Sequence, residues 1–517
     1  MNELEAKYLI AAGRKPARVL RRLLQEISWA GYLAHPRDTS EIVDEYFDTP
    51  DWRLCKAGWS YRLRATEDGL RITLKQLAEQ RSNIFEREEI EQHLFAPLAE
   101  PGAPPPGAVA EALTGMLGSN LQLRPLFSQR NCRQIYHLSH PDHPHAHVEL
   151  ALDRVRVETD PPMSYGEIEF ELHEGPVNAL QDLTGVMEQQ HDLIPARVSK
   201  FQRGLFAAGL EPPSSEVWRS DSGDIYGKWL EVALPHLNQL RKQLKQQEPF
   251  AWEAVHVEGV HQLRVTTRRI RAALRAFANV LPKKAAKRLN ADIQWLTKTL
   301  GPVRDLDVQL ENLQNYRATL PDAQGPALNR YQLHLEQKRR AAHAKLLHAL
   351  ASNRFTELDE HFDRMLAKAT RRAATDWGIS TQQAANEQVL PLLEDVLRKG
   401  NAITASSPAA KLHKLRIQIK RLRYQLEFLV TSYGKPVRQT LKALSKLQNS
   451  LGAFQDANVA LDHLQAYCQH TNLNRIERRT FKLLMAKERE DASVRRRQYA
   501  KRWSRFEKRA LQLQTIL

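Results

Sequence analysis

The chain has 517 residues, and its 76 Lys and Arg against 60 Asp and Glu give a formal charge of +16. That length exceeds what a single hydrophobic core usually organises, so two or more domains are expected. A hydrophobic content of 42% and a charged content of 26% exclude a disordered chain, and the sequence lacks the run of about 18 apolar residues that a membrane-spanning helix needs.

The N-terminal residues and the cysteines indicate the cellular compartment. The first ten residues, MNELEAKYLI, carry charges where a secretory signal peptide would be apolar. Cys55, Cys132 and Cys468 are odd in number and far apart, which favours neither disulfide bonds nor a thiolate metal site. We therefore expect a cytoplasmic protein without a membrane partner, and the sequence leaves its oligomeric state open.

The net charge is divided unevenly along the chain. Residues 1–210 hold 23 Lys or Arg and 30 Asp or Glu, a net charge of −7, and residues 211–517 hold the other 53 basic and 30 acidic residues, a net charge of +23. This asymmetry predicts a different partner for each part. A Pro- and Ser-rich stretch, EPPSSEVWRSDSG, predicts a linker over 211–224 between a first domain at 1–210 and a second domain at 225–517.

Short segments of the first domain alternate between charged and apolar residues, which is the period of a β-strand. The charged faces of ELEAKYL and YGEIEFELH consist of Glu3, Glu5, Lys7, Glu167, Glu169 and Glu171. Similar alternation occurs in WSYRLRA, RITLK, FEREEIE and HVELALDRV, which begin at residues 59, 71, 85 and 147. Whole faces are acidic or basic, whereas a face in solvent usually mixes Thr, Ser, Gln and Lys.

Two architectures fit this alternation. One is an antiparallel sheet with one face in water, and the other is a closed barrel whose charged residues line a tunnel while its apolar residues pack outward against helices. Adjacent carboxylates on one strand repel each other, and a bound cation would offset that cost. In a tunnel, carboxylates supply oxygen ligands for Mg²⁺ or Mn²⁺, and Arg and Lys hold a polyanion, which is the combination that phosphoryl transfer requires.

The same segments resemble, in order, the motifs of the CYTH family, the triphosphate tunnel metalloenzymes. Glu3-Leu-Glu5-Ala-Lys7 matches the family's ExExK motif, and it is followed by YFDT, YRLR, TLK, EREEIE, ELALDR, EIEFEL and SK. The resemblance covers about residues 1–206. It implies an antiparallel eight-stranded β-barrel around a tunnel that binds a triphosphate-bearing substrate and a divalent metal.

The resemblance also implies roles for individual residues. Glu3, Glu5, Glu167 and Glu169 are the expected metal ligands, and with Lys7 they form the expected catalytic set. The expected contacts of the triphosphate are Lys7, Arg62, Arg64, Lys75, Arg87, Arg133 and Lys200. Three alternatives stay open for Glu89, Glu91, Asp153 and Glu171, namely binding a second metal, orienting a water, or balancing the neighbouring cations.

The segment HLSHPDHPHAH, residues 137–147, holds five histidines between two predicted strands. Histidine-rich tracts can bind transition metals. The prolines and the position between strands favour a solvated hairpin loop instead, so these histidines are not among the predicted site residues.

After residue 225 the pattern changes to long helical stretches that contain a repeat. The first copy, HQLRVTTRRIRAAL, places His261, Arg264, Arg268, Arg271 and Arg275 on one helical stripe. The second copy, HKLRIQIKRLRYQL, places His413, Arg416, Lys420 and Arg423 at the same first three steps. Two further motifs, LGPVRDLDVQL and LGAFQDANVAL, follow at nearly the same offset and are interpreted as loops.

This repeat predicts two related helical halves, about 225–398 and 410–517, packed as one domain. Their basic stripes place like charges at i, i+3 and i+4, which destabilises a helix that has no partner for them. An extended anion is the simplest partner. The stripes hold almost no aromatic residue for stacking bases, with Tyr424 the nearest exception, so a phosphate chain fits better than a nucleic acid.

The repeated H-x-x-R pattern resembles the CHAD domain, a helical domain often found behind CYTH domains. This resemblance covers about residues 225–510 and implies binding of inorganic polyphosphate. The expected polyphosphate contacts are His261, Arg264, Arg268, Arg271, His413, Arg416, Lys420 and Arg423. Asn458 in the second copy replaces Asp307 in the first, which leaves the role of that segment open.

Together the two resemblances imply a bacterial inorganic triphosphatase that hydrolyses tripolyphosphate with Mg²⁺ or Mn²⁺ and binds polyphosphate through its helical domain. One alternative is a hydrolase or cyclase that acts on an organic triphosphate such as thiamine triphosphate or ATP. Another is a polyphosphate-binding protein whose barrel is not catalytic. The sequence does not distinguish the preferred metal or show whether the domains are coupled.

Overall fold

The computed structural model describes residues 2–77, 84–98, 100, 102–118, 122–187, 192–211, 225–374, 378–404 and 406–517, except for the side chains of residues 2, 3 and 322–324. The chain divides into two compact units. One unit comprises residues 1–217 and 249–259, and the other comprises residues 218–248 and 260–517. All but the first residue of the predicted linker, 211–224, lies outside the described residues, so the predicted domain boundaries stay a prediction.

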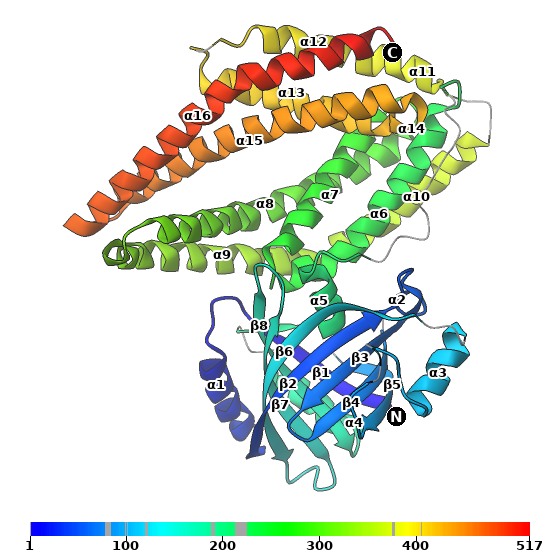
Figure 1. The fold of residues 1–517 in the computed structure, drawn as a ribbon, viewed down its shortest axis with the longest axis vertical. Helices are drawn as coiled ribbons and strands as arrows, with labels where there is room; N and C mark the ends of the chain where they lie inside the picture. Colours follow the sequence, from blue (N-terminus) through cyan, green and yellow to red (C-terminus); the bar gives the residue numbers. More distant parts are fainter. Residues whose placement is uncertain are drawn as a thin grey trace. The chain divides into compact units, whose positions relative to one another are not determined.

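The first unit is an antiparallel β-barrel with short helices around it (Figure 1). Its strands are β1 (Asn2–Ile10), β2 (Leu33–Asp48), β3 (Trp59–Thr66), β4 (Gly69–Gln76), β5 (Ile84–Leu94), β6 (Arg124–Ser139), β7 (His147–Val157), β8 (Met163–Glu174) and β9 (Leu193–Pro195). Its helices are α1 (Pro16–Trp29), α2 (Arg53–Lys56), α3 (Ala108–Leu117), α4 (Val177–Met187) and α5 (Lys200–Ala207).

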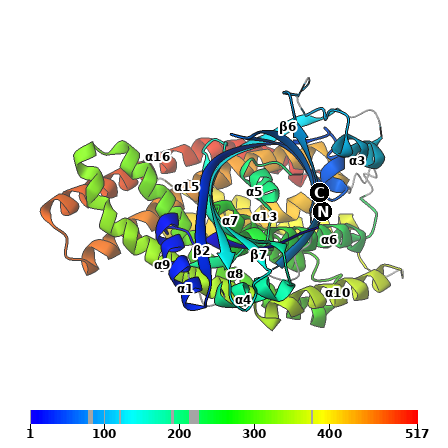
Figure 2. The ribbon, with the colours of Figure 1, turned by 90° about the horizontal axis from the view of Figure 1, so that it is seen from below.

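The strands follow the order β5-β4-β3-β2-β6-β7-β8-β1, and β1 also pairs with β5, which closes the ring. The short β9 pairs with β1 beside this ring. The predicted eight-stranded closed barrel is therefore confirmed. Helix α5 lies across one end of the barrel (Figures 1 and 2), where the Ser199 hydroxyl caps it by accepting a hydrogen bond from the backbone N–H of Gln202.

The apolar residues of the strands point out of the barrel, as the inside-out architecture requires. Tyr8 of β1 and Phe170 of β8 pack with Leu23 of α1 and Leu180 of α4 in one buried cluster. A second cluster joins α3 to strands β3 and β4 and includes Tyr61, Ile72, Leu74, Val109 and Leu113. Because these cores lie outside the ring, the alternate residues of each strand are left to line its interior.

The second unit is helical. Its elements are α6 (Trp229–Glu253), α7 (Val257–Ala276), α8 (Lys283–Thr319), the 3₁₀ helix η1 (Asp322–Leu328), α9 (Asn329–Leu350), α10 (Asn353–Ala373), α11 (Thr381–Ala384), the π-helix η2 (Ala385–Val389), α12 (Leu390–Asn401), α13 (Ala409–Phe428), α14 (Val430–Tyr433), α15 (Lys435–His470) and α16 (Arg475–Gln514). The last residues of α6 and the first residues of α7 belong to the barrel unit. Among the described helices, none combines the length and apolar character that crossing a membrane requires.

The two copies of the repeat lie on equivalent helices. The histidine–arginine stripes are on α7 and α13, and the motifs that follow them are on α8 and α15, which are 37 and 36 residues long. The interpretation of those later motifs as loops was wrong, because Gly301 and Gly452 lie in the middle of α8 and α15. Packing between long helices outweighs the weak helix propensity of glycine at these two positions.

Helices α12 and α16 meet at a glycine that allows close packing. A Cβ atom built on Gly400 of α12 would lie 1.8 Å from the Trp503 ring of α16. The Tyr499 hydroxyl donates a hydrogen bond of 3.1 Å to the Gly400 carbonyl, and the Trp503 indole N–H donates one of 2.7 Å to the Asn401 side chain. The Trp503 indole is thus held beside the glycine by its hydrogen bond to Asn401, and Tyr499 adds a second hydrogen bond between the two helices.

Gly400→Ala should therefore destabilise the helical unit by about 1–3 kcal/mol, because the added methyl group forces Trp503 out of its packed position. Gly301→Ala is the matched control. Within the described part of the chain, a Cβ atom at Gly301 would have no atom within 4 Å beyond its own helix turn, so the better helix former should stabilise α8 by about 0.5–1 kcal/mol. Urea midpoints from circular dichroism at 222 nm test the pair, and shifts of the same sign would contradict this account of the packing.

Candidate functional site

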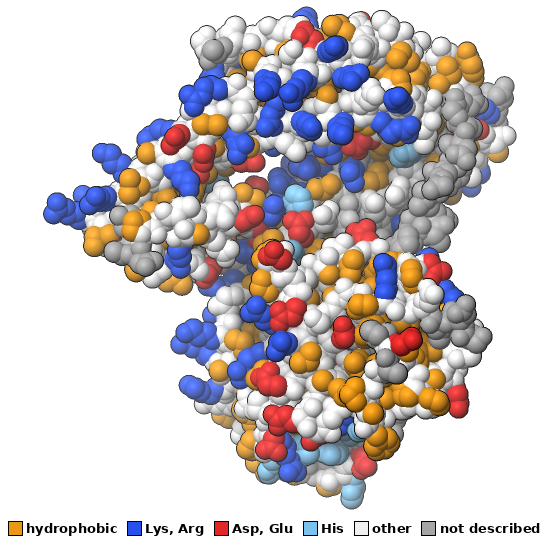
Figure 3. Space-filling view, viewed as in Figure 1, with side chains coloured by type: hydrophobic (Ala, Val, Ile, Leu, Met, Phe, Trp, Pro, Cys, Tyr) orange, Lys and Arg blue, Asp and Glu red, His pale blue; other side chains and the backbone are white. Residues whose placement is uncertain are grey.

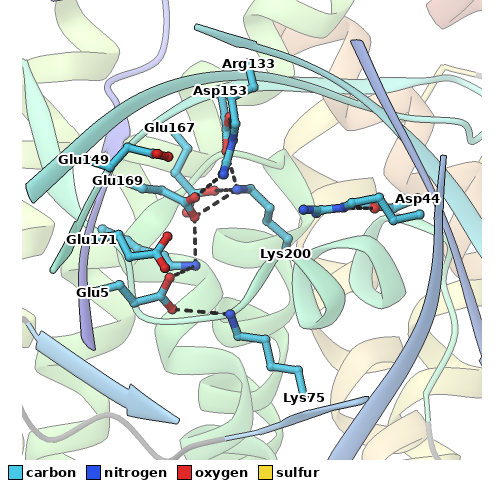
Figure 4. Close-up of polar contacts among 12 residues, drawn as sticks. Glu5, Asp44, Lys75, Arg133, Glu149, Asp153, Glu167, Glu169, Glu171 and Lys200 are labelled. Atoms are coloured by element: carbon cyan, nitrogen blue, oxygen red, sulfur yellow. Dashed lines mark hydrogen bonds and ion pairs between the residues drawn. The ribbon is translucent and has the colours of Figure 1, made fainter. Parts of the chain in front are cut away.

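The charged faces of the strands meet in one cavity inside the barrel (Figure 4). All seven predicted triphosphate contacts line it, namely Lys7, Arg62, Arg64, Lys75, Arg87, Arg133 and Lys200. Among the predicted carboxylates, Glu5, Glu169 and Glu171 also line it. Glu3 is paired with Arg87 between β1 and β5, but its side chain lies outside the described part of the chain.

Lys200 stands at the α5 end of the cavity among three carboxylates. Its ammonium group lies 2.8 Å from Glu169 Oε1 and 3.5 Å from Glu167 Oε2, and it donates a hydrogen bond to Asp153. Lys200 is the first residue of α5, so the capped start of this helix directs the side chain into the barrel. The lysine thereby satisfies buried carboxylates from β7 and β8 at once.

Lys7 connects the two acidic strands. Its Nζ lies 2.7 Å from Glu5 Oε2 and 2.7 Å from Glu169 Oε1, and strand register explains both contacts. Lys7 is opposite Glu169 and Glu5 is opposite Glu171 between β1 and β8. Burial alone would lower the pKa of Lys7, but the charges of Glu169 and Glu5 raise this pKa above its ordinary value, so the ammonium stays charged.

Two arginines are held by aspartates in bidentate pairs. Arg64 donates to both oxygens of Asp44 at 2.7 and 3.0 Å, and Arg133 donates to both oxygens of Asp153 at 2.8 and 2.7 Å. Burial would raise the pKa of Asp44, but the guanidinium groups of Arg64 and Arg62 hold that pKa well below its usual range. Both arginines are therefore fixed in orientation before any ligand arrives.

The remaining cations have looser contacts. Arg62 lies 3.4 Å from Glu89, and Lys75 lies 3.1 Å from the same carboxylate and 4.0 Å from Glu5. Arg87 lies 3.9 Å from Glu5 and stacks over the Phe85 ring. Glu89 thus balances two of the predicted substrate contacts.

Glu91, by contrast, pairs with Arg71 at 3.2 Å and is not among the residues that line the cavity. Of the residues whose roles were left open, Glu171 lines the cavity, and Asp153 and Glu89 contact cations that line it. Glu91 lies on the same face of β5 as Glu89 but pairs with Arg71, which does not line the cavity.

Glu167 and Glu169 of β8 differ in the direction of their pKa shifts. Burial would raise the pKa of Glu169, but Lys200, Lys7 and Arg133 bring it well below its ordinary value. Burial raises the pKa of Glu167, and the charges of Arg203 and Lys200 only partly offset that effect. Neighbouring carboxylates on one strand therefore have opposite protonation tendencies.

The acidic residues present fit a divalent cation. Carboxylate oxygens of Asp153, Glu167 and Glu169 lie within 4.8 Å of one another, and all three residues are buried. Both oxygens of Glu167 and Oε1 of Glu5 are also buried without a hydrogen-bond donor in the described part of the chain. Oxygen donors of this kind suit Mg²⁺ and Mn²⁺. The structure brings Glu167 and Glu169 together with Asp153, while Glu5 faces Lys7.

Reasoning from the sequence missed three residues that organise the tunnel. Asp44 lies on the same face of β2 as Tyr46, and the alternation in EIVDEYFD was the signal that would have identified it. Arg203 of α5 lies 3.5 Å from Glu167 and donates to Glu253 at 2.8 Å, and both residues of this pair are 2% exposed. No pattern in the sequence links Glu253 to the barrel, since it is 50 residues from Arg203.

In the helical unit, the basic stripes of α7 and α13 approach each other. The positive charge of Arg268 on α7 lowers the pKa values of both Arg416 and Lys420 on α13. Arg264 lowers the pKa of Lys420 in the same way, and Arg416 lowers the pKa of Arg264. The Nε atoms of Arg264, Arg268, Arg271 and Arg416 are buried and have no hydrogen-bond acceptor among the described residues. Figure 3 shows many Lys and Arg side chains over the part of this unit where α13 and α15 lie.

Two aspartates moderate this positive cluster. Arg264 lies 3.4 Å from Asp305 of α8, and Asp456 of α15 holds the equivalent position near Arg416 and Lys420. The pKa of Lys420 is lowered to about 7, because burial disfavours the ammonium form and Arg416 and Arg268 repel it. The free protein at neutral pH therefore carries only part of the charge that the sequence assigns to this lysine.

The residues at the ends of the stripes have side-chain partners outside the basic cluster. Arg423 pairs with Glu427 at 2.9 Å within its own helix, and His413 contacts the Gln455 side chain at 3.1 Å. Asp307 is buried in an ion pair with Arg339 of α9, whereas the Asn458 amide donates to a carbonyl of its own helix. The difference between Asp307 and Asn458 is thus one of helix packing, and neither side chain joins the basic cluster.

Comparison with protein families gives two matches. Residues 1–205 match the CYTH domain and residues 236–465 match the CHAD domain. Among curated proteins, an uncharacterized protein of Mycobacterium tuberculosis is 27% identical over 214 residues, and a second strain of that species has a protein with the same identity over the same length. The match covers 40% of this chain and 40% of each relative, so the chain spans less than half the length of these relatives.

Solved structures resemble each part separately. The CHAD domain of Ricinus communis is 26% identical, covering 54% of this chain and 93% of that one with a TM-score of 0.46. A Hippeastrum protein described as an adenylyl cyclase with dominant triphosphatase activity is 18% identical, covering 41% and 98% with a TM-score of 0.29. A triphosphatase of the Mimivirus capping enzyme is 13% identical, covering 36% and 89% with a TM-score of 0.22.

The closed barrel with its charged interior, the helical unit with its duplicated basic stripe and the two family matches agree with one another. The chain is a CYTH–CHAD protein, with its CYTH domain at residues 1–205 and its CHAD domain at residues 236–465.

Proposed function

We propose that the CYTH domain hydrolyses inorganic triphosphate to pyrophosphate and phosphate with the help of Mg²⁺ or Mn²⁺. The observation that carries this proposal is the lining of one cavity by seven cations together with Glu5, Glu169 and Glu171. A bare phosphate chain is recognised by charge and by bidentate donors alone, and this cavity offers both.

The aspartate-held arginines are the first contacts of the substrate. Arg64 and Arg133 line the cavity while Asp44 and Asp153 fix their guanidinium planes, so little side-chain entropy is lost when phosphate oxygens bind. Lys7, Lys75 and the other cations that line the cavity would then neutralise the remaining charge along the phosphate chain. In this arrangement the protein's main contribution is positioning and neutralisation.

Glu3, Glu5, Glu167 and Glu169 are the proposed metal ligands. Glu167 and Glu5 have the strongest support, because both oxygens of Glu167 and Oε1 of Glu5 are buried and lack a hydrogen-bond donor in the described part of the chain. A bound divalent ion would neutralise phosphate charge and lower the pKa of a water nucleophile. Glu171 faces the cavity and is the proposed carboxylate that orients this water and accepts its proton. Phosphate oxygens of the substrate would replace carboxylate oxygens as the partners of the Lys7 and Lys200 ammonium groups.

The aromatic residues near the cavity favour an inorganic substrate over a nucleotide. Tyr46 and Phe201 line the cavity, but their rings pack against each other at 5.3 Å and both pack on Phe127. These rings are part of a buried cluster and do not present a face on which a base or thiazole would stack.

Glu5→Gln should lower Mg²⁺-dependent release of phosphate from tripolyphosphate by about a hundredfold, because the amide keeps the shape of the side chain but removes a metal-binding charge. Glu88→Gln, on an exposed position of β5, is the matched control and should retain full turnover. Unchanged turnover in Glu5→Gln, with the fold confirmed by circular dichroism, would refute the proposed chemistry. Faster turnover of ATP or thiamine triphosphate by the unmodified chain would favour the organic alternative.

We also propose that the CHAD domain binds inorganic polyphosphate through the facing stripes of α7 and α13. The buried Nε atoms of Arg264, Arg268, Arg271 and Arg416, which lack acceptors among the described residues, support this proposal, since phosphate oxygens would satisfy them. His261, Arg271, His413 and Arg423 extend the proposed surface along both helices. A polyanion would also relieve the repulsion between Arg268 and the cations of α13.

Binding of polyphosphate should take up about one proton per chain at pH 8. Lys420 is largely neutral there because its pKa is about 7, and a bound anion would restore the charged form by raising that pKa. Calorimetric titrations of long-chain polyphosphate in two buffers of different ionisation enthalpy measure this uptake.

Lys420→Met should abolish the proton uptake, whereas Lys442→Met, which removes an exposed lysine of α15, should retain it. Proton release, or an equal uptake in Lys420→Met, would contradict the proposed site.

A further inference from the structure

Histidines and carboxylates form a continuous row across the tunnel-facing side of the barrel. In register, Glu5 of β1 is opposite Glu171 of β8, Glu171 is opposite Glu149 of β7, Glu149 is opposite His137 of β6, and His137 is opposite His35 of β2. Residues paired in this way on neighbouring strands have Cβ atoms about 4.5–5.5 Å apart. The row lies four residues along β7 and β8 from Asp153 and Glu167, away from Lys200 and α5.

Two more histidines lie beside this row at the end of the strands. His173 follows Glu171 on the same face of β8, and its Nε2 lies 3.7 Å from Glu149 Oε2 while its Nδ1 lies 3.7 Å from Glu171 Oε1. The His147 ring centroid lies 5.4 Å from that of His173 and 4.8 Å from that of His137. Three imidazoles therefore surround a pair of carboxylates, and Figure 3 shows histidines gathered at this end of the unit.

Two of the other three histidines of the 137–147 segment, His140 and His143, have structural partners, and the third, His145, is exposed. His140 contacts the Ala30 carbonyl at 3.1 Å and stacks on Tyr32, and His143 contacts Asp182 of α4 at 2.9 Å. These contacts fasten the β6–β7 turn to the neighbouring helices. They leave His137 and His147, at the two ends of the turn, as the members that face Glu149 and His173.

The spacing suits a single coordinated ion. One donor atom each from Glu149, Glu171 and His173 can be chosen so that all three lie within 4.8 Å of one another. Ligands about 2.0–2.2 Å from a metal are separated by little more than 3 Å, so modest side-chain rotations would complete the site. Such rotations are open to His173, whose side chain is 39% exposed. A cation would also offset the repulsion between two carboxylates that face each other across β7 and β8.

We propose that Glu149, Glu171 and His173 form a site for a first-row transition metal at the end of the tunnel remote from α5, with His147 or His137 as an additional imidazole ligand. Imidazole nitrogen combined with carboxylate oxygen favours ions such as Zn²⁺, Co²⁺ or Mn²⁺ over Mg²⁺, which prefers oxygen ligands alone. This site shares no ligand with the one proposed for the catalytic metal, but it shares Glu171, the carboxylate proposed to orient the water, so a metal bound here would occupy that carboxylate. It goes beyond the proposed hydrolysis and does not depend on it.

Titration of the full chain with Co²⁺ alone tests the proposal, because the visible absorption of Co²⁺ reports nitrogen ligation. His173→Ala should weaken Co²⁺ binding by at least about tenfold. His93→Ala is the matched control and should leave the affinity unchanged, since His93 is an exposed histidine beside a single carboxylate, Glu91, at 4.0 Å. Millimolar Mg²⁺ should not displace the bound Co²⁺.

Glu5→Gln separates this site from the catalytic one. The histidine-dependent Co²⁺ signal should persist in Glu5→Gln whether or not that variant has lost turnover of tripolyphosphate. Loss of the signal in Glu5→Gln would assign the ion to the catalytic ligands and overturn the proposal. Equal Co²⁺ affinity in His173→Ala and the unmodified chain, or complete displacement by Mg²⁺, would overturn it as well.

Discussion

Carboxylates and cations are buried together inside the barrel. Neither group would be stable there without the other, because burying an unpaired charge is costly. Lys200 contacts Asp153, Glu167 and Glu169, and Lys7 contacts Glu169 and Glu5. A buried ion that loses its partner costs about 3–5 kcal/mol. The interior is therefore a network of opposite charges. An anion that binds Lys or Arg displaces their carboxylate partners, and a bound metal cation must then pair with those carboxylates.

The rest of the barrel follows from placing this network inside. With charged side chains inward, every strand presents its apolar face outward, and α1, α3 and α4 cover those faces in two buried clusters. Ring closure through β1 and β5 leaves no free edge at that junction, which holds the charged faces in register. Helix α5 then brings Lys200 and Arg203 into one end of the tunnel. The helical unit meets the same electrostatic problem differently. Asp305 and Asp456 lie near the facing cations of its two stripes, and Arg423 at the outer end of one stripe pairs with Glu427.

The sequence correctly predicted which side chains share a face wherever a single strand or helix determines that arrangement. Strict alternation in β1 and β8 identified Glu5, Lys7 and Glu169, because a two-residue period fixes which side chains share a face. It could not identify the pairing of Arg203 with Glu253, which depends on tertiary contact across 50 residues. The interpretation of the segments around Gly301 and Gly452 as loops was also wrong, because the packing of long helices decides their conformation. The roles of the site residues and the substrate stay predictions.

A crystal structure of the full chain with tripolyphosphate and Mn²⁺ tests the central claim most directly, since Mn²⁺ can be located by anomalous scattering. If the substrate and the metal replace the present ion pairs, phosphate oxygens should contact Arg64, Arg133 and Lys200. Mn²⁺ should then be bound by carboxylates that pair with Lys7 or Lys200 in the free chain. Triphosphate bound only to the helical unit, with the ion pairs of the barrel interior unchanged, would contradict it.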